Sequence, residues 1–180
     1  MIAPHDEIEA PLIARLGALG IAVEIHRHPA LHTVAESGAL HDALPGAHIK
    51  NLFLRDKKRR QWLVTARQDA TVDLKALRHV IGASGNLSFG SAELLAASLG
   101  VAPGSVTPFA VMNDPEGIVT MVLDRAILDH TTVNAHPLHN EATAAIARDD
   151  LLAFLEACGH PPALIDLGCS PRIARPAIGG

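Results

Sequence analysis

The stretch from Gly46 to Ala66 constrains the fold of this chain more than any other. Two runs of β-branched, aromatic and aliphatic residues, 49–54 and 62–66, suit a pleated and partly buried surface, and a charged segment separates them. This pattern predicts a β-hairpin. The presence of Lys50 in this predicted strand needs a separate explanation, because a lysine among strand residues either extends to water or holds its charge in a cleft. A lysine that keeps an edge strand from aggregating is the structural alternative.

The length and composition predict one folded domain. A chain of 180 residues, 48% hydrophobic and 19% charged, can bury a full core without disulfides or metals. We expect the domain to occupy residues 1–167 and residues 168–180 to form a tail rich in Pro and Gly. The two cysteines, Cys158 and Cys169, lack the spacing of a disulfide framework or a zinc site, which favours a reducing compartment.

The sequence predicts a cytoplasmic protein. Its N-terminus is acidic and lacks a basic region followed by an apolar one, and no apolar run approaches the roughly 20 residues that cross a membrane. We therefore expect no membrane partner.

The charge distribution limits how nucleic acid could be bound. A net charge of −4 argues against non-specific coating of nucleic acid, and the 3% aromatic content supplies few base-stacking side chains. We expect no DNA partner. The one dense basic cluster is the predicted hairpin turn, which either stays in solvent or contacts an RNA backbone. Its candidate RNA-binding residues are Lys57, Lys58, Arg59 and Arg60.

The remaining pattern predicts alternating helices and strands. A helix from about Ile8 to Leu19 has its apolar residues at helical spacing and Gly20 as a cap, and Pro11 suggests that its regular part begins near that proline. A capping box of Thr33 and Glu36 predicts a short helix. Further helices are expected at 73–81, 92–99 and 148–157, and further strands at 21–26, 87–89, 118–123, 129–135 and 163–167.

Three histidines lie within seven residues, at His26, His28 and His32. A metal site needs side chains that converge from fixed positions, and a strand end followed by a proline loop supplies no obvious geometry for one. We therefore predict no metal site, and a metal hydrolase stays as the third-ranked alternative. The loop from His28 to Thr33 leads into a helix and is of the kind that lines binding sites.

Two other loops carry candidate chemistry. The loop 101–109 has glycine at position 104 between two prolines, so it is stiff and can bring the amides of residues 104–107 close to an oxyanion or a carbonyl. A plain rigid turn is the alternative. His136 ends a predicted strand just before a proline, with His139 and Asn140 in the loop that follows. His136 is either a residue of a functional site or a polar group whose hydrogen bonds are made within the fold.

These segments resemble a known family when they are taken in order. They are H-P-A-L-H-T-V-A-E, G-A-H-I-K-N-L-F-L, P-G-S-V-T-P-F and V-N-A-H-P-L-H-N-E-A-T, together with the N-D turn before an apolar strand. The chain is similar to the YbaK/ProX-type aminoacyl-tRNA editing domains over about residues 8–167, and within them to the freestanding alanyl-tRNA(Pro) deacylases of the ProXp-ala type. K-N-L-F-L and the glycine-to-proline loop are the most specific pieces.

The resemblance implies an α/β fold of the α+β kind, with a mixed β-sheet curled into a partial barrel and surrounded by helices. It also implies a pocket for the aminoacylated 3′ end of a mischarged tRNA, no cofactor, and prolyl-tRNA synthetase as a transient partner. The residues expected to act in catalysis are Lys50, Asn51, Gly104 and His136. Those expected to bind substrate are His28, Thr33, Ser105, Val106, Thr107, Pro108 and Asn140.

The chemistry expected from the sequence is direct attack by water on the aminoacyl ester. There is no G-x-S-x-G motif, and neither cysteine has a histidine arrangement that would activate it. We expect Lys50 to hold the phosphate or ester region, the residue 104 loop to face the carbonyl, and Asn51 and His136 to order water or ribose hydroxyls. Deacylation of Cys-tRNA(Pro) or another mischarged tRNA, and a non-catalytic tRNA- or synthetase-binding module, are the alternatives.

Overall fold

The computed structural model describes residues 5–31 and 34–167. Its elements in chain order are α1 (His5–Ala18), β1 (Val23–Arg27), α2 (Val34–Ala43), β2 (Ala47–Arg55), β3 (Gln61–Arg67), α3 (Leu74–Val80), β4 (Ser88–Phe89), α4 (Ala92–Leu99), the 3₁₀ helix η1 (Pro108–Asn113), β5 (Val119–Asp124), the 3₁₀ helix η2 (Arg125–Asp129), β6 (Thr132–Ala135), β7 (Ala142–Ala147), α5 (Arg148–Ala157) and β8 (Ala163–Ile165). The predicted capping residue Thr33 and the predicted tail 168–180 lie outside the described residues.

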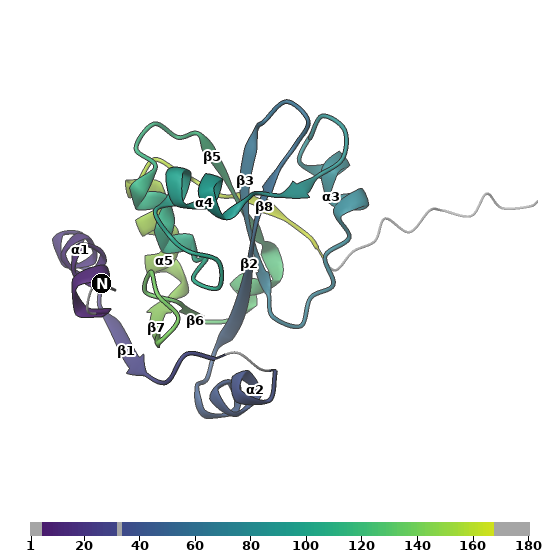
Figure 1. Ribbon diagram of the computed structural model, residues 1–180. Helices are drawn as coiled ribbons and strands as arrows, with labels where there is room; N and C mark the ends of the chain where they lie inside the picture. Colours follow the sequence, from purple (N-terminus) through teal and green to yellow (C-terminus); the bar gives the residue numbers. More distant parts are fainter. Residues whose placement is uncertain (1–4, 32–33, 168–180) are drawn as a thin grey trace, which may run out of the picture.

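The strands form one mixed sheet with the order β1-β7-β6-β2-β3-β5-β8, and β4 pairs with β2 beside this path. The sheet curls without closing and has helices around it, which confirms the expected fold class (Figure 1). The long strand β2 crosses the middle of the molecule. It pairs with β3 along its length, from Ile49 with Arg67 to Arg55 with Gln61, so the predicted hairpin is present.

The other edge of β2 is paired only at its two ends. Ala47 and His48 pair with β6, and Leu54 and Arg55 pair with β4. Residues 49–52 therefore have no strand partner on that side within the described chain. This gap opens the sheet at its centre.

Local capping explains where several helices begin and end. Asp73 accepts hydrogen bonds from the amides of Lys75 and Ala76 at the start of α3, and Ser91 accepts one from Leu94 at the start of α4. Gly100 ends α4 in the left-handed region, at φ 66°. These helices and α5 match the sequence expectation.

Helix α1 begins earlier than its sequence suggests. The structure starts it at His5 and keeps Pro11 in its interior, although a proline there removes one backbone hydrogen bond. The helix continues because its inner face is held: Leu12 and Leu16 are fully buried, and Glu9 makes buried contacts with β1 and the loop after β6. Tertiary packing therefore outweighs the local cost of the proline.

Strand β7 was not expected from the sequence. Its residues, A-T-A-A-I-A, are mostly small and have little β-propensity. It is a strand because it lies between β1 and β6 and pairs antiparallel with both. The sequence also predicts one strand over 129–135, whereas the structure has η2 to Asp129 and then β6 from Thr132.

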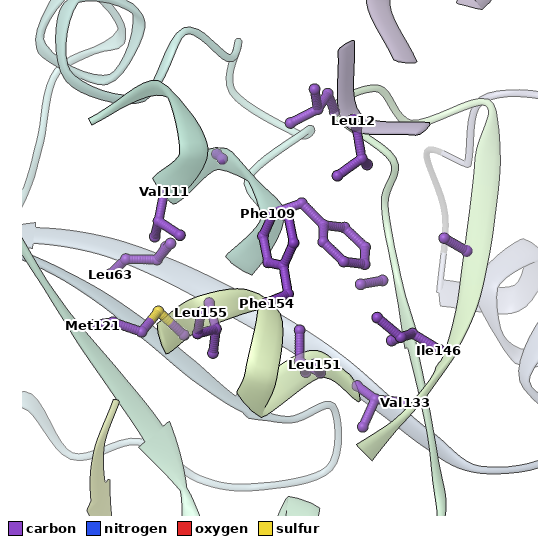
Figure 2. Close-up of a cluster of buried hydrophobic side chains, with 14 of the residues drawn as sticks. Leu12, Leu63, Phe109, Val111, Met121, Val133, Ile146, Leu151, Phe154 and Leu155 are labelled. Atoms are coloured by element: carbon purple, nitrogen blue, oxygen red, sulfur yellow. The ribbon is translucent and has the colours of Figure 1, made fainter. Parts of the chain in front are cut away.

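The core has two parts, one on each side of the central strands. Figure 2 shows the larger part, in which Phe109 and Phe154 meet edge-to-face with ring centroids 5.4 Å apart. Helices α1, α4 and α5 contribute to this part, whereas α3 packs its Leu77 into the smaller cluster around Leu54 and Trp62. The two parts hold β2 in place from both faces. Within the described chain, none of the helices has the length and hydropathy that a membrane span requires.

Candidate functional site

A polar cavity of about 250 Å³ opens at the unpaired edge of β2. It is lined by Leu31, Ser37, Leu40, His41, His48, Ile49, Lys50, Asn51, Gln68, Gly104, Val106, Asn134, Ala135, His136, Asn140 and Thr143. These residues come from α2 and the loop before it, β2, the end of β3, the loop before η1, β6 with the loop that follows it, and β7. The gap between the β6 and β4 pairings of β2 is what allows the loop before η1 to reach the strand.

Lys50 lies on β2 opposite Ala66 of β3 and is half-buried. Its Nζ donates a hydrogen bond to the backbone carbonyl of Ala70, just after β3. An ammonium group has three donors, so two remain after this bond. Because Lys50 also lines the cavity, its charge is fixed at the cavity wall.

Asn51 ties the loop before η1 to the sheet. Its Nδ2 donates to the carbonyl of Val106 at 3.0 Å, and its Oδ1 accepts from the hydroxyl of Thr65 on β3 at 2.6 Å. The Thr65 side chain is fully buried and lies opposite Asn51 in the hairpin register. One amide thus fixes the distance between the central strand and the loop.

The predicted glycine-to-proline loop is divided by the structure. Gly104, at φ +86°, and Val106 line the cavity. Thr107 is fully buried and caps η1 by accepting from the Phe109 amide, and Pro108 is the first residue of η1. Ser105 is buried, and its amide donates to the Ala102 carbonyl. Ser105, Thr107 and Pro108 do not line the cavity.

His136 enters the cavity from the end of β6, and Asn140 enters from the same loop. The His136 Nδ1 lies 3.4 Å from the carbonyl of Ala142. Because a carbonyl only accepts, Nδ1 carries the proton and the lone pair of a neutral ring is on Nε2. Burial lowers the pKa of His136, as do the nearby His28 and His139, and the Ala142 carbonyl only partly offsets this. His136 is therefore a neutral imidazole near pH 7.

His28 lies outside the cavity lining. Its Nε2 is 2.9 Å from the hydroxyl of Thr143, which does line the cavity, and its Nδ1 is 2.8 Å from the carbonyl of Pro29. It borders a separate, open hollow together with Arg27 and Glu141. His28 therefore contacts the cavity wall from behind. Thr33 lies outside the described residues.

The sequence analysis missed a pair of imidazoles in the cavity wall. His48 and His41 lie with ring centroids 4.1 Å apart, and the His48 Nε2 is 2.7 Å from the Leu44 carbonyl. Burial, and then His48, lower the pKa of His41. His48 had a signal, because it stands two residues before Lys50 on one strand and therefore on the same face. His41 had none, since only the docking of α2 brings it there.

Asn134, Gln68 and Thr143 were also missed. Asn134 is buried, and its Nδ2 donates to the Pro45 carbonyl at 3.0 Å, next to the start of β2. Asn134 on β6 and Thr143 on β7 reach the cavity because β6 pairs with both β2 and β7. Gln68 follows β3, and its backbone amide donates to the His48 carbonyl on β2 at 2.8 Å.

The basic turn between β2 and β3 lies at the other end of the hairpin from the hydrogen bond of Lys50. Lys57, Lys58 and Arg59 are exposed. Arg60 is bound within the protein: it pairs with the buried carboxylate of Asp56 at 2.8 Å, donates to the Gly82 carbonyl at 2.7 Å and lies over the Trp62 ring at 5.2 Å. Three of the four cations are therefore directed at solvent.

The clustered histidines of the sequence do not converge where the structure describes them. His26 faces Glu24 at 3.4 Å, and His28 bonds to Thr143 as described above. Across residues 5–31 and 34–167, no three His, Cys, Asp or Glu side chains are grouped as metal ligands would be.

The fold and cavity define an α/β domain with a small polar cavity at an opened strand of a curled sheet. A family model for the aminoacyl-tRNA editing domain matches residues 28–154. The chain belongs to the aminoacyl-tRNA editing domain family, as the motifs of the sequence predicted.

Several relatives are similar over nearly the whole chain. Prolyl-tRNA synthetase associated domain-containing protein 1 of Mus musculus is 40% identical over 165 residues, which cover 89% of this chain and 97% of the mouse protein. Prolyl-tRNA editing protein ProX of Acetoanaerobium sticklandii is 36% identical over 157 residues, covering 87% of this chain and 95% of that protein.

A solved structure of a candidate trans-editing enzyme for prolyl tRNA synthetase has a similar fold. It superimposes with a TM-score of 0.71 at 20% identity and covers 94% of this chain and 99% of its own. The fold is thus shared well beyond the segment that the family model matches.

Proposed function

We propose that this protein is an aminoacyl-tRNA deacylase that hydrolyses mischarged tRNA, with Ala-tRNA(Pro) as its substrate. The observation that carries the proposal is the meeting of Lys50, the Gly104 loop and a neutral His136 around one small cavity. Family membership and the similarity to ProX support the same reaction. An aminoacyl ester is already activated, so the protein has only to orient it, place a water and stabilise the oxyanion.

Lys50 supplies the positive charge. The bond to the Ala70 carbonyl holds its Nζ at the wall, and the remaining donors bind the terminal phosphate or the ester region of the substrate. An ammonium that is already held loses little conformational freedom when the substrate arrives.

The loop from residue 104 faces the carbonyl of the ester. Its amides at Gly104 and Val106 make no hydrogen bond to the described part of the chain, so they are available to an oxyanion. Asn51 acts by positioning this loop, because both ends of its amide are engaged with Val106 and Thr65.

His136 acts on the water. Its pKa lies below the ordinary value, so the ring is neutral near pH 7 and its Nε2 accepts a proton or a hydrogen bond from the attacking water. Asn140 lies in the same loop and binds the water or a ribose hydroxyl.

The size of the cavity supports a small acyl group. Its volume of about 250 Å³ lies below the roughly 300–1,000 Å³ of pockets that take drug-sized ligands, and five of its lining residues also border a neighbouring hollow of about 620 Å³. A small apolar pocket discriminates one methylene by only about 10- to 200-fold, which is why editing after aminoacylation is needed for such residues.

The tRNA body is proposed to contact the basic turn. Along β2 the five steps from Lys50 to Arg55 span about 17 Å at roughly 3.3 Å each, so one RNA strand can reach both the cavity and the turn. The names of the mammalian relatives support prolyl-tRNA synthetase as a transient partner.

Hydrolysis rates over a panel of aminoacyl-tRNAs test the proposal. The purified chain, without synthetase, is incubated with Ala-, Cys-, Ser- and Pro-tRNA(Pro) and with Ala-tRNA(Ala). The proposal predicts rapid deacylation of Ala-tRNA(Pro) and little loss of the correctly charged species. Preference for Cys-tRNA(Pro) would transfer the proposal to that substrate, and binding without hydrolysis would favour a non-catalytic module.

A further inference from the structure

A buried acid–histidine pair connects helix α1 with the loop that carries His136 and Asn140. Glu9 of α1 is 6% exposed and His139 of the loop is 5% exposed, and the Glu9 Oε2 lies 3.1 Å from the His139 Nε2. Neither residue lines the cavity. The proposed chemistry therefore leaves this pair without a role.

The hydrogen bonds define the tautomer of His139. The backbone N–H of Glu141 donates to its Nδ1 at 3.2 Å, so Nδ1 is unprotonated. The proton is then on Nε2, which donates to the Glu9 carboxylate. The ring is therefore held in this orientation between one amide and one carboxylate.

Glu9 is ionised although it is buried. Burial alone raises the pKa of its carboxyl, but hydrogen bonds from Arg27 of β1 and from His139 bring the pKa below the usual range. Arg27 Nη1 donates to Glu9 Oε2 at 3.0 Å, and Arg27 Nη2 bonds to the other oxygen. The carboxylate thus joins α1, β1 and the loop after β6.

The loop needs such an anchor. Leu138 is a non-glycine residue at φ +71°, a left-handed conformation that persists only when the surroundings hold it. The bond from His136 to the Ala142 carbonyl is long, at 3.4 Å, so His136 fixes its own position weakly. The hydrogen bond to Glu9 holds His139, which lies between Leu138 and Asn140.

We propose that Glu9 is a positioning residue for the cavity: through His139 it fixes the loop 136–140, and with it the directions in which His136 and Asn140 face a bound ester. The inference rests on the proposed function of the cavity. The family model begins its match at residue 28, so Glu9 lies outside the matched segment.

The test compares two buried acid–histidine pairs. Asp114 and His160 form a second pair, 3.0 Å apart and each at most 4% exposed, that does not line the cavity. Asp114→Ala therefore controls for the general cost of losing a buried pair. Asp6→Ala controls for the loss of the exposed partner of Arg27. Both are compared with Glu9→Ala and Glu9→Gln.

Kinetics on Ala-tRNA(Pro) give the first readout. We expect Glu9→Ala to lower kcat by about 10- to 100-fold with KM almost unchanged, because a catalytic group misplaced by about 1 Å costs that much. Asp114→Ala and Asp6→Ala should keep the kcat of the folded protein. His139→Gln, which keeps a donor in place of Nε2, should retain most of the kcat that His139→Ala loses.

Nuclear magnetic resonance of the histidine rings gives a readout that needs no activity. Long-range ¹⁵N–¹H spectra of the intact chain should show His139 as the Nε2–H tautomer, and Glu9→Ala or Glu9→Gln should shift the ring signals of His136. Asp114→Ala should leave them in place. If Glu9→Ala does not fold, Glu9→Gln and the two His139 variants decide by the same criteria.

The outcomes separate this inference from the proposed function. Unchanged His136 signals in the Glu9 variants, or equal kcat losses in Glu9→Ala and Asp114→Ala, would overturn the positioning role. A wild-type chain that hydrolyses no aminoacyl-tRNA, but whose His136 signals move in the Glu9 variants, would overturn the proposed function and leave the positioning role supported.

Discussion

The amide of Asn51 offers a quantitative test of how the cavity is built. In Asn51→Ala, the Val106 carbonyl loses its donor and the fully buried Thr65 hydroxyl loses its acceptor. Two hydrogen bonds contribute about 0.5–1.5 kcal/mol each, and a buried polar group left unpaired adds to the cost, so we expect a loss of about 2–4 kcal/mol in the free energy of unfolding.

Urea denaturation measures this loss. With a slope of about 1–3 kcal/mol per molar urea, the midpoint should fall by roughly 1–2 M. The rate of deacylation should also fall, because the loop before η1 is no longer held to β2 at Val106.

Two further variants make the test specific. Asn51→Asp keeps the oxygen that accepts from Thr65 but turns a second oxygen toward the Val106 carbonyl, so it should destabilise more than Thr65→Val. The Asn51→Ala/Thr65→Val double mutant should show a coupling of about 1 kcal/mol, as expected for residues in one hydrogen-bond network. A cost below about 0.5 kcal/mol for Asn51→Ala, the range of surface substitutions, would refute the reasoning.

The charged groups give three other predictions. Alanine at residues 57–59 should weaken tRNA binding and reduce the slope of log binding constant against log salt concentration by about 1 for each phosphate that is no longer bound. Arg60→Ala should mainly destabilise the fold. An unchanged slope would show that the turn stays in solvent. Because burial lowers the pKa of His136 from 6.5, kcat should stay level down to that pH and fall below it, and an inflection above 6.5 would contradict this. Burial raises the pKa of Asp114, but hydrogen bonds from the Val119 amide, His160 and the Ile118 amide bring it below 3.8. The stabilisation by Asp114 should therefore be complete well above pH 3.8 and should be lost as the pH falls through the lower pKa of the folded protein. Asp114→Asn should lose this pH dependence of the free energy of unfolding.

The elements with strong local signals could be predicted from the sequence. The hairpin of β2 and β3 followed from two apolar runs around a charged turn. Helix α3 followed from the spacing of its apolar residues, and α4 followed from its caps Ser91 and Gly100. Each of these signals acts within a few residues, so no knowledge of the remaining fold was needed.

The elements that depend on distant partners could not be predicted. Strand β7 consists largely of alanine and is a strand only because β1 and β6 flank it. The early start of α1 depends on Glu9, whose partners Arg27 and His139 are 18 and 130 residues away in the sequence. Local propensity is a weak guide where packing of this kind decides.

The candidate site shows the same division. Lys50, Gly104 and His136 each stood out in their own segment, but their expected catalytic roles came from the family resemblance. The stacked pair of His41 and His48 was missed because the docking of α2 against β2 brings the two rings together. The role of Asn51 as a tie between strand and loop also required the structure, since Val106 is 55 residues further along the chain.

The most direct test of the proposed function is the single-turnover hydrolysis of Ala-tRNA(Pro) by Lys50→Ala, with Lys75→Ala as an exposed control of equal charge. Circular dichroism and the unfolding midpoint verify that both variants fold. We predict that Lys50→Ala lowers the rate by about 100- to 1,000-fold, as the loss of one electrostatic contact to the reacting group does in other enzymes, and that Lys75→Ala retains it. A wild-type rate in folded Lys50→Ala would contradict the account.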